Sequence, residues 1–138
     1  MITISADLSL EAQCEMAVER TVELLGGLDV LVNNAGYLAK ESFTHLSMQT
    51  IDESMAVNLK SAVKLSQCAL ASLQRSPGGN IVNVSSIAGL RAWPGALAYK
   101  MSKAAMDQMT RCVALEVGDI YYSFVKHDAM PALKKCLI

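Results

Sequence analysis

The chain has 138 residues, of which 52% are hydrophobic and 18% are charged, as in a single soluble globular domain. Its 12 basic and 13 acidic side chains form no basic cluster, which argues against a nucleic-acid partner because phosphate binding needs several cations on one face. The first residues do not read as a secretion signal, and no apolar run approaches the ~18 residues of a membrane-spanning helix, so we expect a cytoplasmic protein with no membrane contact.

The N-terminal quarter of the chain reads as a strand followed by a helix. Residues 2–5 form a short β-type run, and Ser9 is the expected N-cap of a helix that Gly26 and Gly27 end. Glutamates recur every fourth residue along one side of this helix, and apolar residues lie on the opposite side. We interpret the acidic row as a solvated face.

Two more strands and two long helical patterns follow in alternation. The second strand, residues 28–33, precedes a helical region over residues 47–75, which is long enough to be two helices or one kinked helix. The third strand, residues 80–86, precedes a helix over residues 94–117. Strands that alternate with helices indicate βαβ units and a parallel sheet.

Cysteine and histidine give no sign of a metal site. The four cysteines contain no C-x-x-C pair, and we interpret them as reduced thiols. His45 and His127 lack the spacing of metal ligands, so surface or loop positions are expected for both. Trp93 precedes the last helix and is open to two readings, the wall of a substrate pocket or an aromatic packed on the core.

Polar side chains follow the second and third strands where these strands end. Asn33-Asn34-Ala35-Gly36 and Ser85-Ser86 lie there, and each alone is also explained as an ordinary turn or helix cap. Tyr99 and Lys103 begin the helix that follows Ser86, and Tyr-x-x-x-Lys alone is a weak signal. In parallel α/β sheets the ligand site lies beyond the carboxyl ends of the strands, so we expect these groups to converge.

The spacing of Tyr99 and Lys103 suits proton transfer. A free tyrosine has a pKa of about 10, too high for efficient proton exchange near neutral pH, and a nearby ammonium favours the phenolate. Positions i and i+4 share a helix face, whereas Lys100 is expected to point elsewhere. A serine hydroxyl then holds a carbonyl or alcohol oxygen while the tyrosine transfers the proton and a cofactor exchanges hydride.

Four motifs, NNAG, MAVNLKS, GGNIVNVSSIAG and Tyr99-x-x-x-Lys103, follow one another in this order. Together they resemble the short-chain dehydrogenase/reductase family over residues 2–116. The resemblance implies a catalytic tetrad of Asn58, Ser86, Tyr99 and Lys103. It also implies that Asn58 sits at a helix kink and holds a water that relays protons through the lysine.

The same resemblance implies the ligands. The cofactor would be NAD(P)(H), with no preference assigned between NAD and NADP, and the substrate a small carbonyl or alcohol compound. Asp7 would contact the adenine ring, while Tyr99 and Lys103 would touch the nicotinamide ribose. Asn33, Ala35 and Gly36 would line the cofactor. The last helix looks most like the carbonyl-reductase and 3-oxoacyl-reductase-like branches, and the two long helices would form a homo-oligomer interface.

The chain departs from the family pattern at both ends. It contains no T-G-x-x-x-G-x-G turn, and nothing after residue 117 matches the pattern. We therefore expect a partial Rossmann-type (doubly wound) three-layer αβα fold with a parallel sheet, truncated at both ends and lacking the first βαβ unit and the last strands. Residues 1–117 would be the NAD(P)-binding domain and residues 118–138 a divergent tail. Either the first strand pairs beside the second, or apolar edges stay exposed.

Two functions remain open at this point. One is a carbonyl–alcohol oxidoreductase that uses Tyr99 as its acid/base. The other is a catalytically inactive, truncated isoform that binds full-length relatives through the long helices. The complete tetrad favours the first function, and the missing glycine-rich turn favours the second.

Overall fold

The computed structural model describes residues 2–117 and 121–127, which contain a three-stranded parallel sheet in the order β1-β2-β3. These strands are β1 (Val30–Asn33), β2 (Asn80–Ser86) and β3 (Tyr121–His127). Val30 of β1 aligns with Asn80 of β2, and Asn80 aligns with Tyr121 of β3. The partial doubly wound α/β class is therefore confirmed.

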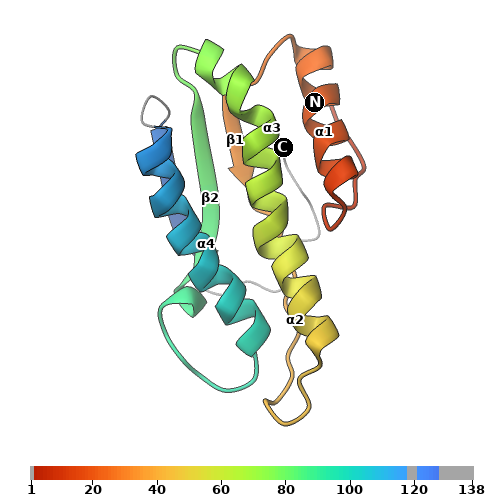
Figure 1. The fold of residues 1–138 in the computed structure, drawn as a ribbon, viewed down its shortest axis with the longest axis vertical. Helices are drawn as coiled ribbons and strands as arrows, with labels where there is room; N and C mark the ends of the chain where they lie inside the picture. Colours follow the sequence, from red (N-terminus) through yellow and green to blue (C-terminus); the bar gives the residue numbers. More distant parts are fainter. Residues whose placement is uncertain (1, 118–120, 128–138) are drawn as a thin grey trace.

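The helices cover one face of this sheet (Figure 1). They are α1 (Glu11–Leu25), α2 (Met48–Met55), α3 (Ser61–Arg75) and α4 (Leu97–Glu116). A π-helical segment, η1 (Ala56–Lys60), joins α2 to α3, and a short 3-10 helix, η2 (Ile87–Gly89), follows β2. In the part of the chain that the structure describes, two of the three layers of the expected fold are thus seen, helices and sheet.

Local sequence explains where these helices begin and end. Ser47 caps α2, because its hydroxyl accepts a hydrogen bond from the Thr50 amide at 3.0 Å. Gly26 ends α1 in the left-handed region at φ 77°, which a residue without a Cβ adopts at no steric cost. The interruption of the second helical region at η1 confirms the expectation of a kink or two helices.

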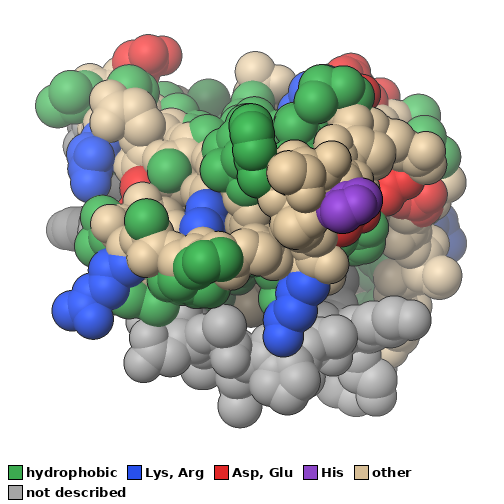
Figure 2. All heavy atoms as spheres, turned by 90° about the horizontal axis from the view of Figure 1, so that it is seen from below, with side chains coloured by type: hydrophobic (Ala, Val, Ile, Leu, Met, Phe, Trp, Pro, Cys, Tyr) green, Lys and Arg blue, Asp and Glu red, His purple; other side chains and the backbone are tan. Residues whose placement is uncertain are grey.

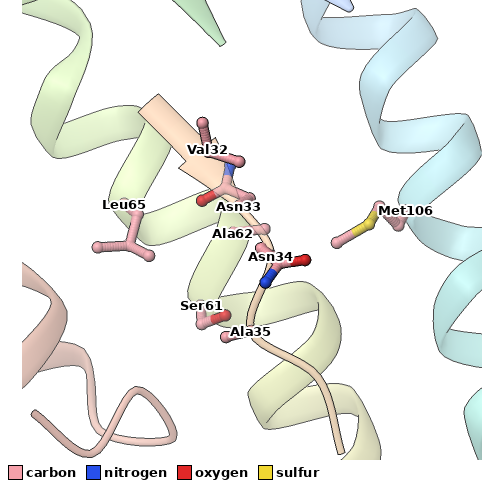
Figure 3. Close-up of a pocket in the computed structure, with 8 residues that line it drawn as sticks. All are labelled: Val32, Asn33, Asn34, Ala35, Ser61, Ala62, Leu65 and Met106. Carbon is pink, nitrogen blue, oxygen red and sulfur yellow. The ribbon is translucent and has the colours of Figure 1, made fainter. Parts of the chain in front are cut away.

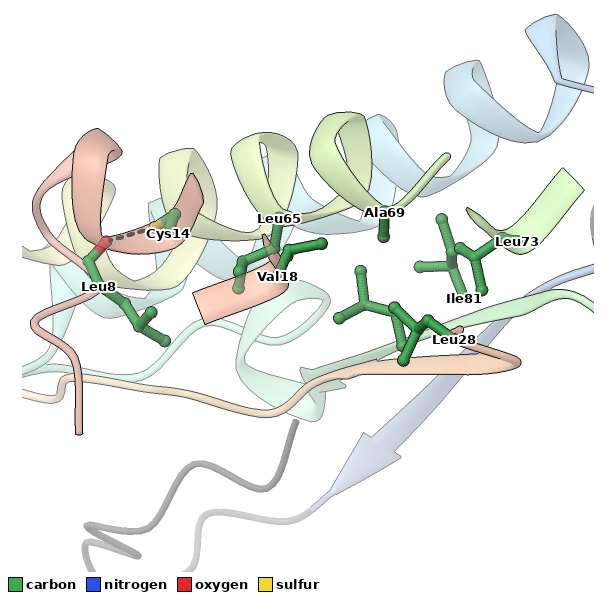
Figure 4. Close-up of a cluster of buried hydrophobic side chains, with 9 residues drawn as sticks. Leu8, Cys14, Val18, Leu28, Leu65, Ala69, Leu73 and Ile81 are labelled. Atoms are coloured by element: carbon green, nitrogen blue, oxygen red, sulfur yellow. Dashed lines mark hydrogen bonds between the residues drawn. The ribbon is translucent and has the colours of Figure 1, made fainter. Parts of the chain in front are cut away.

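The hydrophobic core lies between the sheet and helices α1 and α3 (Figure 4). Alternate residues of the strands, such as Leu31 and Ile81, are fully buried against these helices. The cluster comprises Leu8, Cys14, Val18, Leu28, Leu31, Leu65, Ala69, Leu73 and Ile81. The valines of the opposite face are less covered: Val30 is 44% exposed, and Val32, Val82 and Val84 are half-buried.

Four sequence expectations about these elements are wrong. Residues 2–5 form no strand, and Ile2 is exposed. The segment therefore does not pair beside the strand over residues 30–33, and its apolar side chain stays in solvent. A strand needs a neighbour to hydrogen-bond, and alternation in a sequence does not reveal whether one is present. Ser9 does not cap α1; its hydroxyl donates to Asp7, and Leu10 holds the cap position. The last helix begins at Leu97 rather than at residue 94.

The fourth concerns the tail, where no strand was expected and β3 extends the sheet beside β2. The run Tyr-Tyr-Ser-Phe-Val is rich in aromatic and β-branched residues, and this propensity was the available signal. The proposed division of the chain into residues 1–117 and residues 118–138 stays a prediction. Residues 118–120 and 128–138 of that tail lie outside the described residues, and so does the side chain of His127.

Candidate active site at the carboxyl edge of the sheet

Helix α4 presents Tyr99 and Lys103 together. The Lys103 ammonium lies 5.8 Å from the centroid of the Tyr99 ring, as the i, i+4 spacing predicts. Only 3% of Lys103 is exposed, and its Nζ donates a 2.8 Å hydrogen bond to the backbone carbonyl of Val84 in β2. The same nitrogen lies 3.8 Å from the Met106 sulfur. The strand thus holds a buried cation beside the tyrosine ring.

Burial changes the acidity of this cation. Desolvation lowers the pKa of Lys103 from 10.5 to about 8, and the negative charge of Asp107, one helical turn further along α4, partly opposes this effect. The ammonium is therefore close to its titration range under mildly alkaline conditions. Such a shifted group beside a tyrosine at a sheet edge is typical of a functional site.

The end of β2 brings Ser86 to the same region. Its hydroxyl oxygen accepts a 3.1 Å hydrogen bond from the Ala88 amide and so caps η2, which uses the oxygen and not the proton of the hydroxyl. Only 1% of Ser86 is exposed in this structure. Ser85 donates a 3.4 Å hydrogen bond to the backbone carbonyl of Lys103. Because Val84, Ser85 and η2 all contact α4 around Lys103, strand end and helix are fixed relative to each other.

Gly89, at the end of η2, is a site-shaping residue that the motif analysis left without a role. A Cβ placed on it would lie 3.0 Å from the Lys103 carbonyl carbon and 3.1 Å from the Ala104 nitrogen. Such distances are tighter than nine in ten contacts of real side-chain carbons, so a larger residue would require α4 or η2 to shift by a few tenths of an ångström. Its position at the end of SSIAG was the available signal.

Asn58 sits inside the π-helical segment, which turns it into the protein interior. Its side-chain oxygen accepts a hydrogen bond from the Tyr37 amide at 2.6 Å, and its Nδ2 donates to the Tyr37 carbonyl at 2.9 Å and to the Ser102 hydroxyl at 2.8 Å. Ser102 in turn donates to the Tyr99 carbonyl at 2.8 Å. π-Helical turns often occur at functional sites. Asn58 thus ties the loop after β1 to the first turns of α4, and Ser102 is a further member that the motifs did not indicate.

The side chain of Asn33 is engaged in the sheet. Its Nδ2 donates to the Asn83 oxygen at 2.8 Å and to the Ser66 hydroxyl at 3.2 Å. Asn83 donates onward to Thr110 of α4 at 2.9 Å. Through Asn33, this chain of hydrogen bonds ties the ends of β1 and β2 together, and it also joins α3 and α4 to the sheet.

A small pocket opens between the end of β1, α3 and α4 (Figure 3). Asn34 and Ala35 form one wall, and Asn34 reaches toward Met106 of α4 across it, as Figure 3 shows. The full lining is Val32, Asn33, Asn34, Ala35, Ser61, Ala62, Leu65 and Met106. Gly36 follows the pocket, and a Cβ there would meet nothing closer than 3.9 Å, so the backbone is open to close approach.

Asp7 lies on the exposed loop before α1. Its carboxylate accepts hydrogen bonds from the Ser9 hydroxyl at 2.7 Å and the Ser9 amide at 3.0 Å, and both hold the pKa of Asp7 below its ordinary value. Its backbone amide donates to Gln13. These contacts form a local turn, so Asp7 is not among the residues that the structure links to Tyr99 and Lys103.

Trp93 and Lys100 meet in the loop between η2 and α4. The Lys100 ammonium lies 4.0 Å from the centroid of the indole ring and donates a hydrogen bond to the Trp93 carbonyl. Lys100 therefore points away from Tyr99, as expected. Trp93 keeps 42% of its surface exposed, so it is not a core aromatic. His45 is exposed and hydrogen-bonded to Ser42, which confirms its expected loop position.

Exposed hydrophobic side chains gather at this end of the molecule. Figure 1 shows β1 pointing toward the loops that precede α2 and α4, and Figure 2, seen from that side, shows apolar side chains interspersed with Lys and Arg. Loops and helix starts on this side carry Leu38, Phe43, Met48, Leu90, Trp93 and Leu97, all exposed. We call this set the apolar rim.

A model of the short chain dehydrogenase family matches residues 1–121. The chain belongs to this family. The match includes every residue of the site described above, and it ends at the first residue of β3.

Individual relatives agree with this family assignment. An uncharacterized oxidoreductase of Thermotoga maritima is 43% identical over 76% of the chain and 42% of its own length. Carbonyl reductase [NADPH] 2 of Sus scrofa is 38% identical over 74% of the chain and 42% of its own length. A solved structure, the NADH-dependent reductase A1-R′ complexed with NAD, covers 91% of the chain with a TM-score of 0.86 at 27% identity, and the chain covers 56% of it. The chain thus spans about half the length of these relatives.

In the part of the chain that the structure describes, no helix is long and apolar enough to cross a membrane. Within the same residues, no three His, Cys, Asp or Glu side chains come together as metal ligands would.

Proposed function

We propose that the chain carries the catalytic centre of an NAD(P)(H)-dependent oxidoreductase that interconverts a carbonyl and an alcohol. The observation that carries the proposal is the buried Lys103 ammonium, 5.8 Å from the Tyr99 ring, hydrogen-bonded to the strand that ends in Ser86. Membership in a family of oxidoreductases supports it.

In this proposal each residue has a separate task. The Ser86 hydroxyl donates a hydrogen bond to the substrate oxygen, and Tyr99 gives that oxygen its proton in reduction or removes it in oxidation. The Lys103 ammonium stabilises the phenolate that forms when the proton has left. Asn58 keeps the loop after β1 and the start of α4 in register through its three hydrogen bonds, consistent with the family role of supporting a proton-relay water.

The residues present fit one end of the cofactor. The pocket beside Asn34 and Ala35 has a volume of about 10 Å³, room for about one water, so a cofactor ring would lie along the surface there. The unobstructed backbone at Gly36 leaves space for its close approach, and Lys103 and Tyr99 suit the ribose hydroxyls. When bound, NAD(P)(H) supplies or accepts the hydride. The role of Asp7 at the adenine stays a proposal, as does the choice between NADH and NADPH, since one relative's name carries NADPH and another's NADH.

Titration with NADH and NADPH, followed by turnover of a dicarbonyl, tests this proposal. We expect saturable binding, and a Tyr99→Phe variant should lose about a hundredfold or more of the turnover while it still binds cofactor. Tyr37→Phe is the matched control, because Tyr37 also lies near the site but its phenol pairs with Glu53. Equal turnover by the Tyr99 variant and the parent protein would refute the proposal.

A second candidate is a catalytically inactive binding partner of related chains, such as a truncated isoform. The exposed apolar residues Met101 and Leu115 on α4 favour association through this helix, as a homo-oligomer or with a relative. Light scattering of a Met101→Glu, Leu115→Glu variant measures its association, and a turnover assay of the same variant distinguishes the two candidates. A partner protein would lose its association and show no Tyr99-dependent turnover, whereas an enzyme would keep that turnover.

A further inference from the structure

Lys100 is buried in a place that disfavours a lysine. Only 9% of the residue is exposed, and it lies in the first turn of α4, where the helix dipole presents positive charge. Burying an ammonium near a helix N-terminus costs free energy on both counts. A compensating set of contacts is therefore required.

Among the described residues, Trp93 supplies these contacts. The ammonium donates to the Trp93 carbonyl and lies 4.0 Å from the centroid of its indole ring, within the range of a favourable cation–π interaction. One lysine thus holds both the backbone and the side chain of Trp93. Contact with backbone and ring together restrains the position of the loop as well as the orientation of the ring.

The restrained loop joins the two parts of the candidate site. It begins after η2, which Ser86 caps, and it ends at α4, which carries Tyr99. The indole keeps 42% of its surface exposed although Lys100 covers part of it, and it belongs to the apolar rim. A rigid, half-open aromatic surface at this edge is suited to pack against an apolar substituent of a substrate.

We propose that Lys100 is a positioning residue that holds the Trp93 indole as an apolar wall of the substrate entrance, so that the site prefers carbonyl compounds with an aromatic or bulky apolar substituent. The substrate preference rests on the proposed function, whereas the hold of Lys100 on Trp93 does not. The two parts therefore need separate measurements.

Trp93 is the single tryptophan of the chain, so its fluorescence reports directly on the contact. We expect Lys100→Met to raise the acrylamide quenching constant of Trp93 by up to about twofold, because the covered ring face opens. Lys100→Arg should keep the parent value, because a guanidinium also stacks on indole. Lys40→Met, at an exposed position, is the control.

An unchanged quenching constant in folded Lys100→Met would overturn the contact. If that variant does not fold, Lys100→Gln, which keeps a donor for the carbonyl without the charge, replaces it.

The substrate preference is tested with diacetyl and with acetylbenzoyl, in which a phenyl ring replaces one methyl group. For Lys100→Met we expect KM for acetylbenzoyl to rise roughly fivefold with kcat nearly unchanged, and KM for diacetyl to change less than about twofold. Equal changes for both compounds would overturn the preference. If the parent protein turns over neither compound, the proposed function fails, and dissociation constants from Trp93 quenching by the two diketones make the same comparison for the wall.

Discussion

At the scale of single residues, the charge of Lys103 is the feature with the widest consequences. Its pKa of about 8 in the folded protein lies below the 10.5 of an exposed lysine. Between these two pH values the unfolded chain binds more protons than the folded one, so the free energy of unfolding rises with pH over this range. The buried charge lowers stability at neutral pH, and this cost disappears when the group is neutral.

A Lys103→Met variant should reveal this linkage. We expect the stability of the parent protein to rise relative to that of the variant by on the order of 3 kcal/mol between about pH 7 and pH 10.5. Urea unfolding of both proteins at a series of pH values measures the difference, and taking the difference cancels the titrating groups that do not interact with Lys103. Lys40→Met, at an exposed position, should show no such trend. A constant difference across this range would contradict a lowered lysine pKa.

Asn58 leads to a second residue-scale prediction. Its removal leaves the backbone amide and carbonyl of Tyr37 and the hydroxyl of Ser102 without the partners that the side chain provides. Unpaired buried polar groups cost about 1–3 kcal/mol each, with partial relief where water enters. We expect Asn58→Ala to lower the free energy of unfolding by about 3 kcal/mol and Ser102→Ala by about 1 kcal/mol. Chemical denaturation measures both, and the prediction fails if the serine variant is the less stable one.

At the scale of secondary-structure elements, the contact of η2 with α4 depends on Gly89. A methyl group there would lie 3.0 Å from the Lys103 carbonyl carbon, so Gly89→Ala requires η2 and α4 to separate by a few tenths of an ångström. We expect a loss of about 1–3 kcal/mol in stability, the usual range for overpacking. Gly78→Ala is the matched control, because a Cβ at Gly78 meets nothing within 4 Å. Thermal unfolding of the two variants decides, and equal melting temperatures would show that η2 yields without cost.

The elements also show which parts of this fold sequence reasoning can reach. Helices α1, α3 and α4 were predictable because apolar periodicity and turn residues such as Gly26 are local signals. β3 and the failed strand at residues 2–5 depend on whether a neighbouring strand is present to pair, which is not a local property. In the site, the tyrosine–lysine spacing was readable. Asn83 and Gly89 lie within the motif GGNIVNVSSIAG, but their contacts with α4, like those of Ser102 with Asn58, join distant segments, so the motif alone does not reveal their roles.

At the scale of the whole molecule, the sheet has two unlike faces. Leu31 and Ile81 are buried beneath the helices, whereas Val30, Val32 and Val82 on the opposite face keep part of their surface in solvent. Aligned residues of neighbouring strands share a face, so these valines form one continuous apolar strip. Strips of this kind favour dye binding and self-association.

Replacing Val30 and Val82 by threonine should therefore weaken both properties. Threonine keeps the β-branched shape that suits a strand, so the sheet should be retained, while the added hydroxyls make the strip more polar. We expect less fluorescence of a hydrophobic dye and a smaller association constant by sedimentation, with the melting temperature of the protomer nearly unchanged. Leu31→Thr is the opposite case: the hydroxyl would be buried in the core cluster, and the free energy of unfolding should fall by about 2 kcal/mol or more. Unaltered dye binding and association in the valine variant would mean that this face of the sheet is covered in solution, and that association occurs through the helices instead.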